Sequence, residues 1–215
     1  MTLILGIIAI VAVMVGIVWF AFWFTKRVGR AAAQRAVARG WSYRQVDDAL
    51  YRRWCLANGW ARPPVGTRAE HVVRGAVDGI PFAAFLVMET GSNLWNRVVT
   101  CVPLDAPVPM VRIRTRRWLS RVPKGHDAGP LPSVDAEHEV SGDDPVFYQA
   151  LVSHGLGAWL VGRPVDASYW LRDAESWSFL STWSDVHGFD DVFDLIPPRV
   201  RELAQLAAIV DSARS

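Results

Sequence analysis

The stretch "EHVVRGAVDGIPFAAFLVME", Glu70 to Glu89, places β-branched and aromatic residues on either side of the dipeptide Asp78-Gly79. Asp-Gly readily adopts the positive φ angles that a tight two-residue hairpin turn requires. The pattern therefore predicts two antiparallel strands, at residues 69–77 and 80–89. We take this hairpin as the starting point for the rest of the fold.

Two further strands are predicted downstream of the hairpin, at residues 97–103 and 109–116. A Gly91-Ser92-Asn93 turn precedes the first, and a corner containing proline precedes the second. Short connections of this kind favour an antiparallel meander over βαβ units. In the segment 169–183, aromatic residues alternate with Ser and Thr, which indicates one or two half-buried strands.

Three helices are predicted in the part of the chain that follows residue 41. Asp47 or Asp48 can cap a short helix over residues 49–54, and Asp144, followed by Pro145, can cap a second one. Pro197-Pro198 is predicted to open the last helix, whose apolar residues recur at helical spacing up to Val210. The predicted fold class is α+β, with a mainly antiparallel sheet and packed helices.

The N-terminus contains 22 consecutive residues, Leu3 to Phe24, without a charged side chain. As a helix this run would be about 33 Å long, enough to cross a bilayer. It lacks the basic start and the small-residue end of a cleaved signal peptide. We therefore predict a transmembrane helix over residues 1–25, a basic juxtamembrane helix over 26–40 and one α+β domain over 41–215. The loop at 122–135, rich in Pro and Gly, is a candidate internal boundary.

The orientation of the predicted span follows from its basic flank. Lys26, Arg27 and Arg30 follow the apolar run, whereas no Lys or Arg precedes it. The positive-inside rule then predicts a cell-membrane protein with its N-terminus outside and its C-terminal domain in the cytoplasm. Cys55 and Cys101 belong to no CxxC or Cys/His motif, and two reduced, buried thiols fit that compartment.

The small net charge of +2 conceals a strong asymmetry along the chain. Residues 26–126 contain 18 basic and 6 acidic side chains, a net charge of +12, whereas residues 127–215 contain 5 basic and 15 acidic ones, a net charge of −10. The simplest interpretation is that acidic and basic faces partly pair within one fold and otherwise keep it soluble.

A sharper hypothesis assigns a surface for anionic lipid headgroups or a protein partner to a cluster of basic residues without acids. Alternate members of such a cluster would share one face of a strand. Near an anionic leaflet, each basic side chain would contribute roughly 1 kcal/mol to the free energy of membrane binding. No RNP, helix-turn-helix or zinc signature accompanies the cluster, so nucleic acid is not an expected partner. Its residues are Arg112, Arg114, Arg116, Arg117, Arg121 and Lys124.

No phosphate-binding loop, dinucleotide fingerprint, nucleophile elbow or zinc-protease motif is present in the sequence. We predict no catalytic residue and no cofactor. The best cluster of carboxylates with an imidazole that could bind a metal ion is "DVHGFDDVFD", and its simpler interpretation is a solvated loop with Asp190 or Asp191 capping a helical turn. The candidate ligands in this segment are Asp185, His187, Asp190, Asp191 and Asp194.

Several motifs in order, "ARGWSYRQVDDALYRRW", "VVRGAVDGIPFAAFLVMETG" and "DDPVFYQALVSHGLGAWL", followed by a Trp-rich strand, resemble a group of uncharacterised membrane-associated proteins of actinobacteria. The resemblance implies one continuous domain over most of residues 37–185 and brings no activity or catalytic residue with it. The predicted function is a non-catalytic module that binds a protein partner or anionic lipid. The alternative is a membrane-bound enzyme or metal-binding domain that uses the segment 185–194.

Overall fold

The computed structural model describes most of the chain from Gly29 onward. The described residues are 14, 19, 27, 29–57, 67–88, 97–115, 129–131, 138–161, 168–174, 177–185 and 189–215. The strands are β1 (Ser42–Val46), β2 (Arg68–Val77), β3 (Ile80–Met88), β4 (Arg97–Pro103), β5 (Val111–Thr115), β6 (Gly129–Leu131), β7 (His138–Gly142), β8 (Ser168–Ala174) and β9 (Trp177–Asp185). The helices are α2 (Asp48–Ala57), α3 (Pro145–Ser153), α4 (Leu156–Leu160) and α5 (Phe189–Arg214), and residues 29–38 are also helical.

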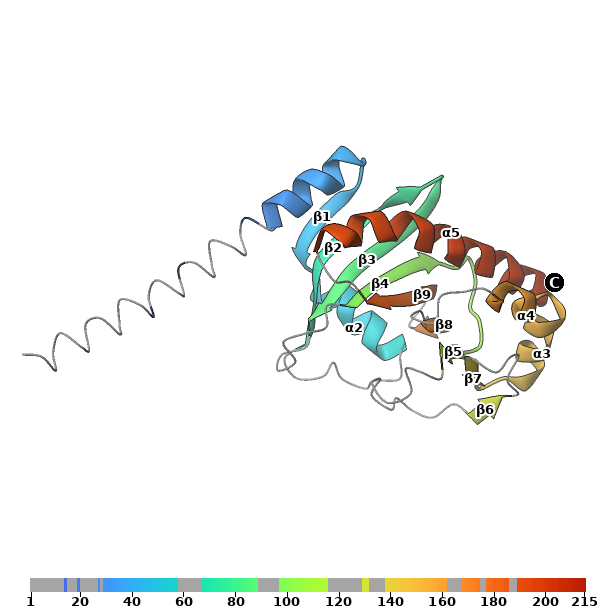
Figure 1. The fold of residues 1–215 in the computed structure, drawn as a ribbon. Helices are drawn as coiled ribbons and strands as arrows, with labels where there is room; N and C mark the ends of the chain where they lie inside the picture. The colour runs from blue at the N-terminus through green and yellow to red at the C-terminus, as the bar shows by residue number, and fades with distance from the viewer. Residues whose placement is uncertain are drawn as a thin grey trace, which may run out of the picture.

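The described strands form one antiparallel sheet in the order β1-β2-β3-β4-β9-β8-β5-β7-β6 (Figure 1). The hairpin at its start is the one that the sequence predicts, because Val77 pairs with Ile80 across Asp78 and Gly79. Both turn residues have positive φ angles, 53° and 81°, as the tight hairpin turn requires. The α+β fold with an antiparallel sheet therefore agrees with the prediction.

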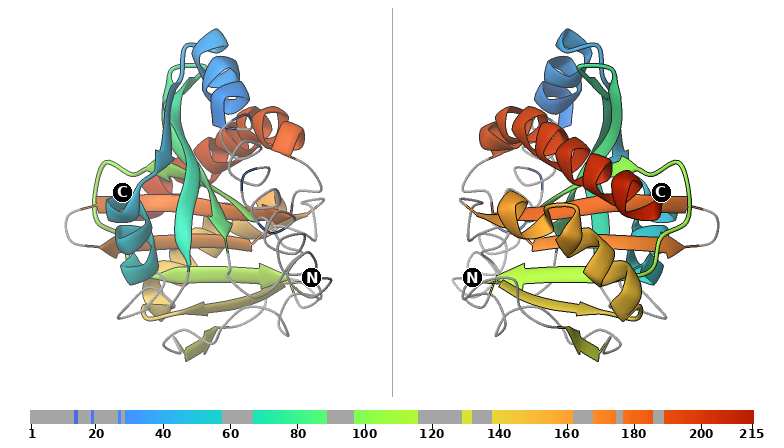
Figure 2. Two further views of the ribbon diagram at one scale, coloured as in Figure 1. Left: turned by 90° about the vertical axis from the view of Figure 1, so that its left-hand side faces the viewer. Right: turned by 90° about the vertical axis from the view of Figure 1, so that its right-hand side faces the viewer.

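Helix α2 packs on one face of the sheet, and the sheet curls around it. Within the sheet, β3, β4 and β9 separate β2 from β8, yet α2 contacts both β2 and β8. Figure 2 shows the strong twist that permits this, with β2 and β3 running across the direction of β5 and β7. The core on this side joins Trp54 and its neighbours on α2 to alternate residues of the central strands, among them Val72, Phe85 and Val99.

The opposite face of the sheet is covered by α5, α3, α4 and the helical residues 29–38 (Figures 1 and 2). The apolar residues of α5 recur at helical spacing and are fully buried against the sheet. They are Ile196, Val200, Leu203, Leu206 and Val210.

A close contact between Trp41 and Gly75 joins the N-terminal helical residues to this face. A Cβ atom at Gly75 would lie 2.4 Å from Cδ1 of Trp41, so only glycine allows the indole to lie on β2. The indole donates to the Ala76 carbonyl over 3.2 Å, and its ring centroid lies 5.0 Å from Phe82. The Trp41 side chain is thereby packed against the β2–β3 hairpin.

Two exposed ion pairs connect α5 to distant parts of the chain. Arg201 of α5 bonds Asp78 in the hairpin turn over 2.7 Å, and Arg39 bonds Asp194 over 3.0 Å. Arg39 also lies over the rings of Trp41 and Phe193. Exposed pairs of this kind contribute little to stability, so they orient α5 more than they stabilise it.

The structure corrects three details of the predicted secondary structure. β5 does not follow β4 in the sheet, because β9 and β8 lie between them. The predicted helix after Asp144 is divided into α3 and α4 at Gly155, whose φ of 102° is not helical. α5 begins at Phe189, before the two prolines, because buried Val192, Phe193 and Ile196 extend its apolar face toward the N-terminus.

The predicted transmembrane helix, and with it the single-pass membrane architecture, is contradicted. Among the described residues, no helix is both long enough and apolar enough to cross a membrane. The longest of them, α5, has 26 residues and carries several charged side chains, among them Asp194, Arg201 and Asp211. Within the apolar run 3–24, only Met14 and Trp19 belong to the described part of the chain.

The packing of Trp41 on Gly75 predicts the effect of one added methyl group. We expect Gly75→Ala to lower the free energy of unfolding by about 1–3 kcal/mol, because the indole must move out of a filled space. Urea unfolding of the full chain measures this. Gly40→Asn is the matched control, since a Cβ at Gly40 meets nothing within 4 Å and asparagine tolerates the φ of 73° there. Equal unfolding free energies for the two variants would contradict the tight contact.

Candidate anion-binding pocket

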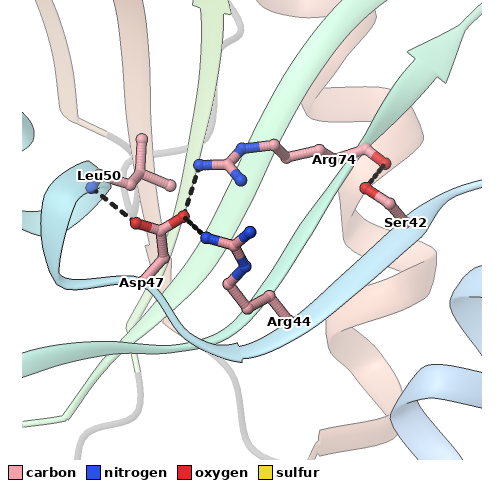
Figure 3. Close-up of polar contacts among 5 residues, drawn as sticks. All are labelled: Ser42, Arg44, Asp47, Leu50 and Arg74. Carbon is pink, nitrogen blue, oxygen red and sulfur yellow. Dashed lines mark hydrogen bonds and ion pairs between the residues drawn. The ribbon is translucent and has the colours of Figure 1, made fainter.

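Asp47 lies where β1 ends and α2 begins, and its carboxylate joins three elements (Figure 3). Its Oδ1 accepts a hydrogen bond from the backbone N–H of Leu50 over 3.0 Å, which caps the first turn of α2. Its Oδ2 accepts from Arg74 of β2 over 2.7 Å and from Arg44 of β1 over 3.4 Å. The carboxylate thereby accepts donors from β1, β2 and α2.

A cavity of about 400 Å³ opens beside this carboxylate. Arg53 comes from the second turn of α2 and is exposed, and it makes no ion pair with any residue that the structure describes. Arg44 and Arg74 are also partly exposed, with 66% and 42% of their side chains accessible, whereas Asp47 is 4% accessible. The residues that line the cavity are Arg44, Asp47, Ala49, Leu50, Arg53, Arg74 and Ala83.

The charges in the pocket do not balance. Three guanidinium groups face one carboxylate, so the lining carries a net charge of +2. Burial acts to raise the pKa of Asp47, but the Leu50 N–H, the hydrogen bond and charge of Arg74 and the charge of Arg44 together hold that pKa below its usual value. Asp47 is therefore ionised at neutral pH, and the surplus positive charge remains available to a bound anion.

The arrangement is suited to binding an anionic group. A guanidinium offers five N–H donors in a planar fork, and Asp47 occupies only one N–H of Arg74 at short distance. The remaining donors of Arg44, Arg53 and Arg74 can take a carboxylate or a phosphate. Asp47 itself cannot act as a general acid near neutral pH, because its lowered pKa keeps the proton off.

A second polar cluster lies on the opposite face of β1. The Tyr43 hydroxyl donates to Oε1 of Gln45 over 2.6 Å and lies 2.8 Å from Nδ1 of His71. His71 has a φ of 52° and occupies a β-bulge, since β2 advances from Glu70 to Val73 while β3 moves only from Leu86 to Ala84.

Burial also controls the titration of this second cluster. It lowers the pKa of His71, and a smaller contribution from Glu70 acts in the opposite direction. Burial, with a further contribution from Glu70, raises the pKa of Tyr43 to about 12. Both side chains are therefore neutral at physiological pH, and they fix the covered face of β1.

Neither cysteine offers a reactive thiolate. Cys55 and Cys101 are free and buried in the core beneath α2. Burial raises the pKa of Cys55 to about 12, despite a hydrogen bond with Tyr51, and it raises the pKa of Cys101 still further. The thiols are protonated at neutral pH and serve as packing groups.

The basic surface predicted from the sequence does not form as expected. Arg112 lies on β5 between buried Val111 and Ile113 and is itself only 6% exposed, so it cannot belong to an exposed face. Arg114 is on the same strand, paired in register with Glu139 of β7. Arg116, Arg117, Arg121 and Lys124 lie outside the described residues. Of the residues used to orient the chain, Arg27 and Arg30 are exposed and Lys26 is not described.

The candidate metal ligands are divided between two elements. Asp185 is the last residue of β9, Asp190 and Asp191 are in the first turn of α5, and His187 lies outside the described residues. Asp194 is exposed and paired with Arg39. Among the residues that the structure describes, no group of three His, Cys, Asp or Glu side chains could hold a metal ion.

The sequence predicts Asp47 or Asp48 as the cap of α2, but it does not predict the pocket around Asp47. The missing information is the register between β1 and β2, which pairs Ser42 with Arg74 and Arg44 with Val72. That register places Arg44 and Arg74 on one face, next to the cap. A usable signal is that Ser42 and Arg44 alternate with Tyr43, which indicates a strand with one polar face.

The contacts of Asp47 predict a pH-dependent loss of stability. We expect Asp47→Asn to lower the free energy of unfolding by about 1–3 kcal/mol at neutral pH, because asparagine keeps the cap and loses the charged hydrogen bonds. The folded pKa is depressed, so this contribution is present above the unfolded pKa of about 3.9 and disappears as the pH falls through the folded pKa.

Urea unfolding of the wild type and Asp47→Asn at a series of pH values measures this difference. It should be largest above about pH 5 and shrink below about pH 4. Asp47→Ala should be less stable than Asp47→Asn by about 1 kcal/mol, because alanine also removes the cap. A difference between the wild type and Asp47→Asn that stays constant with pH would contradict the assignment.

Comparison with known proteins gives a likeness of fold. No protein-family model matches the chain, and no curated protein matches it. The structure is similar to the crystal structure of the mycobacterial trehalose monomycolate transport factor A, TtfA, with a TM-score of 0.60 and 16% sequence identity. The similarity covers 85% of this chain and 95% of that one. At this level of identity, the likeness shows that the two chains share a fold.

Proposed function

We propose that this protein is a non-catalytic binding module that holds an anionic group of a second molecule in the pocket of Arg44, Arg53 and Arg74. We further propose that it serves as an accessory to lipid transport. The first part rests on the chemistry of the pocket. The second part rests on the fold that the chain shares with a transport factor.

The observation that carries the proposal is the surplus of guanidinium groups around one carboxylate that already accepts three donors. Arg74 is held by Asp47 at 2.7 Å, which fixes its direction, while most of its donors remain unused. Arg53 has no counter-ion among the described residues. Placing three cations at one cavity is unfavourable unless solvent or a bound anion screens them, so an incoming anion gains more there than at a single surface arginine.

The titration properties of the nearby groups support binding over chemistry. Asp47 stays ionised, and the thiols of Cys55 and Cys101 stay protonated. None of these groups is poised to exchange a proton or to attack a substrate near neutral pH. The alternative of a metal-dependent enzyme centred on the segment 185–194 receives no support from Asp194, which is exposed and paired with Arg39.

The placement in lipid transport is taken from the structural neighbour. TtfA is described as a trehalose monomycolate transport factor, and the fold likeness extends over 95% of its chain. A binding module without catalysis is compatible with an accessory role of that kind. We also propose that the chain is related to the group of membrane-associated proteins of actinobacteria that its motifs resemble, and that its domain lies in the cytoplasm.

A direct test of the pocket compares two neighbouring arginines of α2. Arg52 and Arg53 are both exposed, but only Arg53 lines the cavity. We expect Arg53→Ala to weaken binding of inorganic pyrophosphate by about tenfold, as the loss of one charge-assisted hydrogen bond predicts. Arg52→Ala removes the same charge outside the pocket and should change the affinity by less than about twofold.

Isothermal titration of the full chain at constant ionic strength measures both affinities. Unfolding by urea serves as the control for stability, and neither exposed arginine should alter it by more than about 0.5 kcal/mol. Equal loss of affinity in the two variants would mean that the anion responds to general surface charge, and it would contradict the proposed pocket.

A further inference from the structure

We propose that the outer edge of β1 is the docking site for an extended acidic segment of a partner protein. The segment would add a strand to the sheet and place a carboxylate in the arginine pocket. This inference rests on the proposed function and names the partner of the same pocket. It follows from the position of β1, the direction of its main-chain groups and the charge beside it.

The position of β1 leaves one of its edges open. β1 is the terminal strand of the sheet, and within the described part of the chain no strand pairs with its outer side. Main-chain N–H and C=O groups at such an edge can pair with an added strand. The five residues of β1 offer room for a segment of similar length.

The direction of the main-chain groups follows from the hairpin. The Ala76 carbonyl accepts from the Trp41 indole and the Arg74 carbonyl accepts from the Ser42 hydroxyl, so both carbonyls point toward β1. Ser42 pairs with Arg74 and its main chain therefore faces β2, as does that of Arg44 two residues later. Both main-chain groups of Tyr43 and the N–H of Gln45 then point outward, to the open edge, whereas at the end of the strand the Asp47 N–H turns back to β2 and donates to the Ala69 carbonyl over 3.3 Å.

This alternation determines which side chain an added strand would meet. Tyr43 would form a hydrogen-bonded pair with an antiparallel partner strand, and Gln45 would donate its N–H to that strand, so Arg44 between them would form a non-hydrogen-bonded pair. Side chains in such pairs approach most closely, and their Cα atoms are about 4.5 Å apart. A Glu or Asp opposite Arg44 would lie on the same face as Arg53 and Arg74 and would complete the charge balance of the pocket.

Charge also argues against a second copy of this chain as the occupant. Two β1 strands paired antiparallel through Tyr43 and Gln45 would place Arg44 opposite Arg44 of the other copy. Like charges directly opposite one another are destabilising. A lipid headgroup would satisfy the arginines but would leave the outward main-chain groups of β1 unused.

The decisive variants differ only in one outward N–H group. Gln45→Pro removes the N–H at the open edge, and proline is tolerated on an edge strand where no ladder bond is lost. Gln45→Ala keeps that N–H and removes the same side chain, including its bond with Tyr43, so it is the matched control. The difference in affinity between these two variants isolates the main-chain contact.

The probe is a fluorescent peptide of about eight residues in which glutamate and valine alternate, with binding to the full chain measured by anisotropy. We expect Gln45→Pro to bind about tenfold more weakly than Gln45→Ala, and Arg53→Ala about tenfold more weakly than Arg52→Ala. The same peptide with alternate amides N-methylated should lose most of its affinity for the wild type.

The outcomes separate this inference from the proposed function. Binding of the peptide that depends on Arg53 but is equal in Gln45→Pro and Gln45→Ala would overturn the strand addition and leave the anion pocket intact. Arg53-dependent binding to phosphatidylglycerol vesicles, without peptide binding, would identify a lipid headgroup as the occupant and also overturn it. If neither probe distinguishes Arg53→Ala from Arg52→Ala, the proposed function fails as well.

Discussion

The twist of the β2–β3 hairpin is the constraint on which the rest of this structure depends. The tight turn at Asp78 and Gly79, with both φ angles positive, has the twist that matches two paired right-handed strands. The twist continues across the sheet, so that α2 contacts strands as far apart as β2 and β8. On the outer side, the same strands support α5, which buries Val200 and Leu203 against them. The sheet is therefore covered on two faces by helices of very different length.

The candidate site is a product of the same geometry at the margin of the sheet. α2 leaves the end of β1 to enter the concave face, and Asp47 stands at the corner where the chain changes direction. A buried carboxylate at such a corner requires donors, and Arg44 and Arg74 supply them from neighbouring strands. The opposite side of β1 is fixed by Tyr43, Gln45 and His71. These two polar clusters hold β1 from both sides, and only the side with Arg44 carries charge.

Short sequence patterns predicted turns and helix caps correctly. They did not predict strand order, helix starts or burial, because these depend on contacts between residues distant in sequence. The hairpin turn, a cap at Asp47 or Asp48 and the Asp144 cap are each encoded within a few residues, and the structure contains the turn and the caps at Asp47 and Asp144. The insertion of β9 and β8 between β4 and β5 depends on pairing across the whole chain, which short spacing cannot reveal. The prolines predict that α5 begins at Pro197, although the packing of Phe193 and Ile196 determines where it begins. Arg112 shows the same limit, because a strand with both faces buried looks from sequence like one with an exposed basic face.

The bulge at His71 has a consequence for recognising distant relatives of this protein. One extra residue in β2 reverses which side of the strand each preceding residue faces, so that the side chains before the bulge alternate in the opposite phase to those after it. A related chain without that residue would show one unbroken alternation of apolar and polar positions along this strand, whereas here the alternation changes phase at His71. At 16% identity such a phase change is easily mistaken for an alignment error.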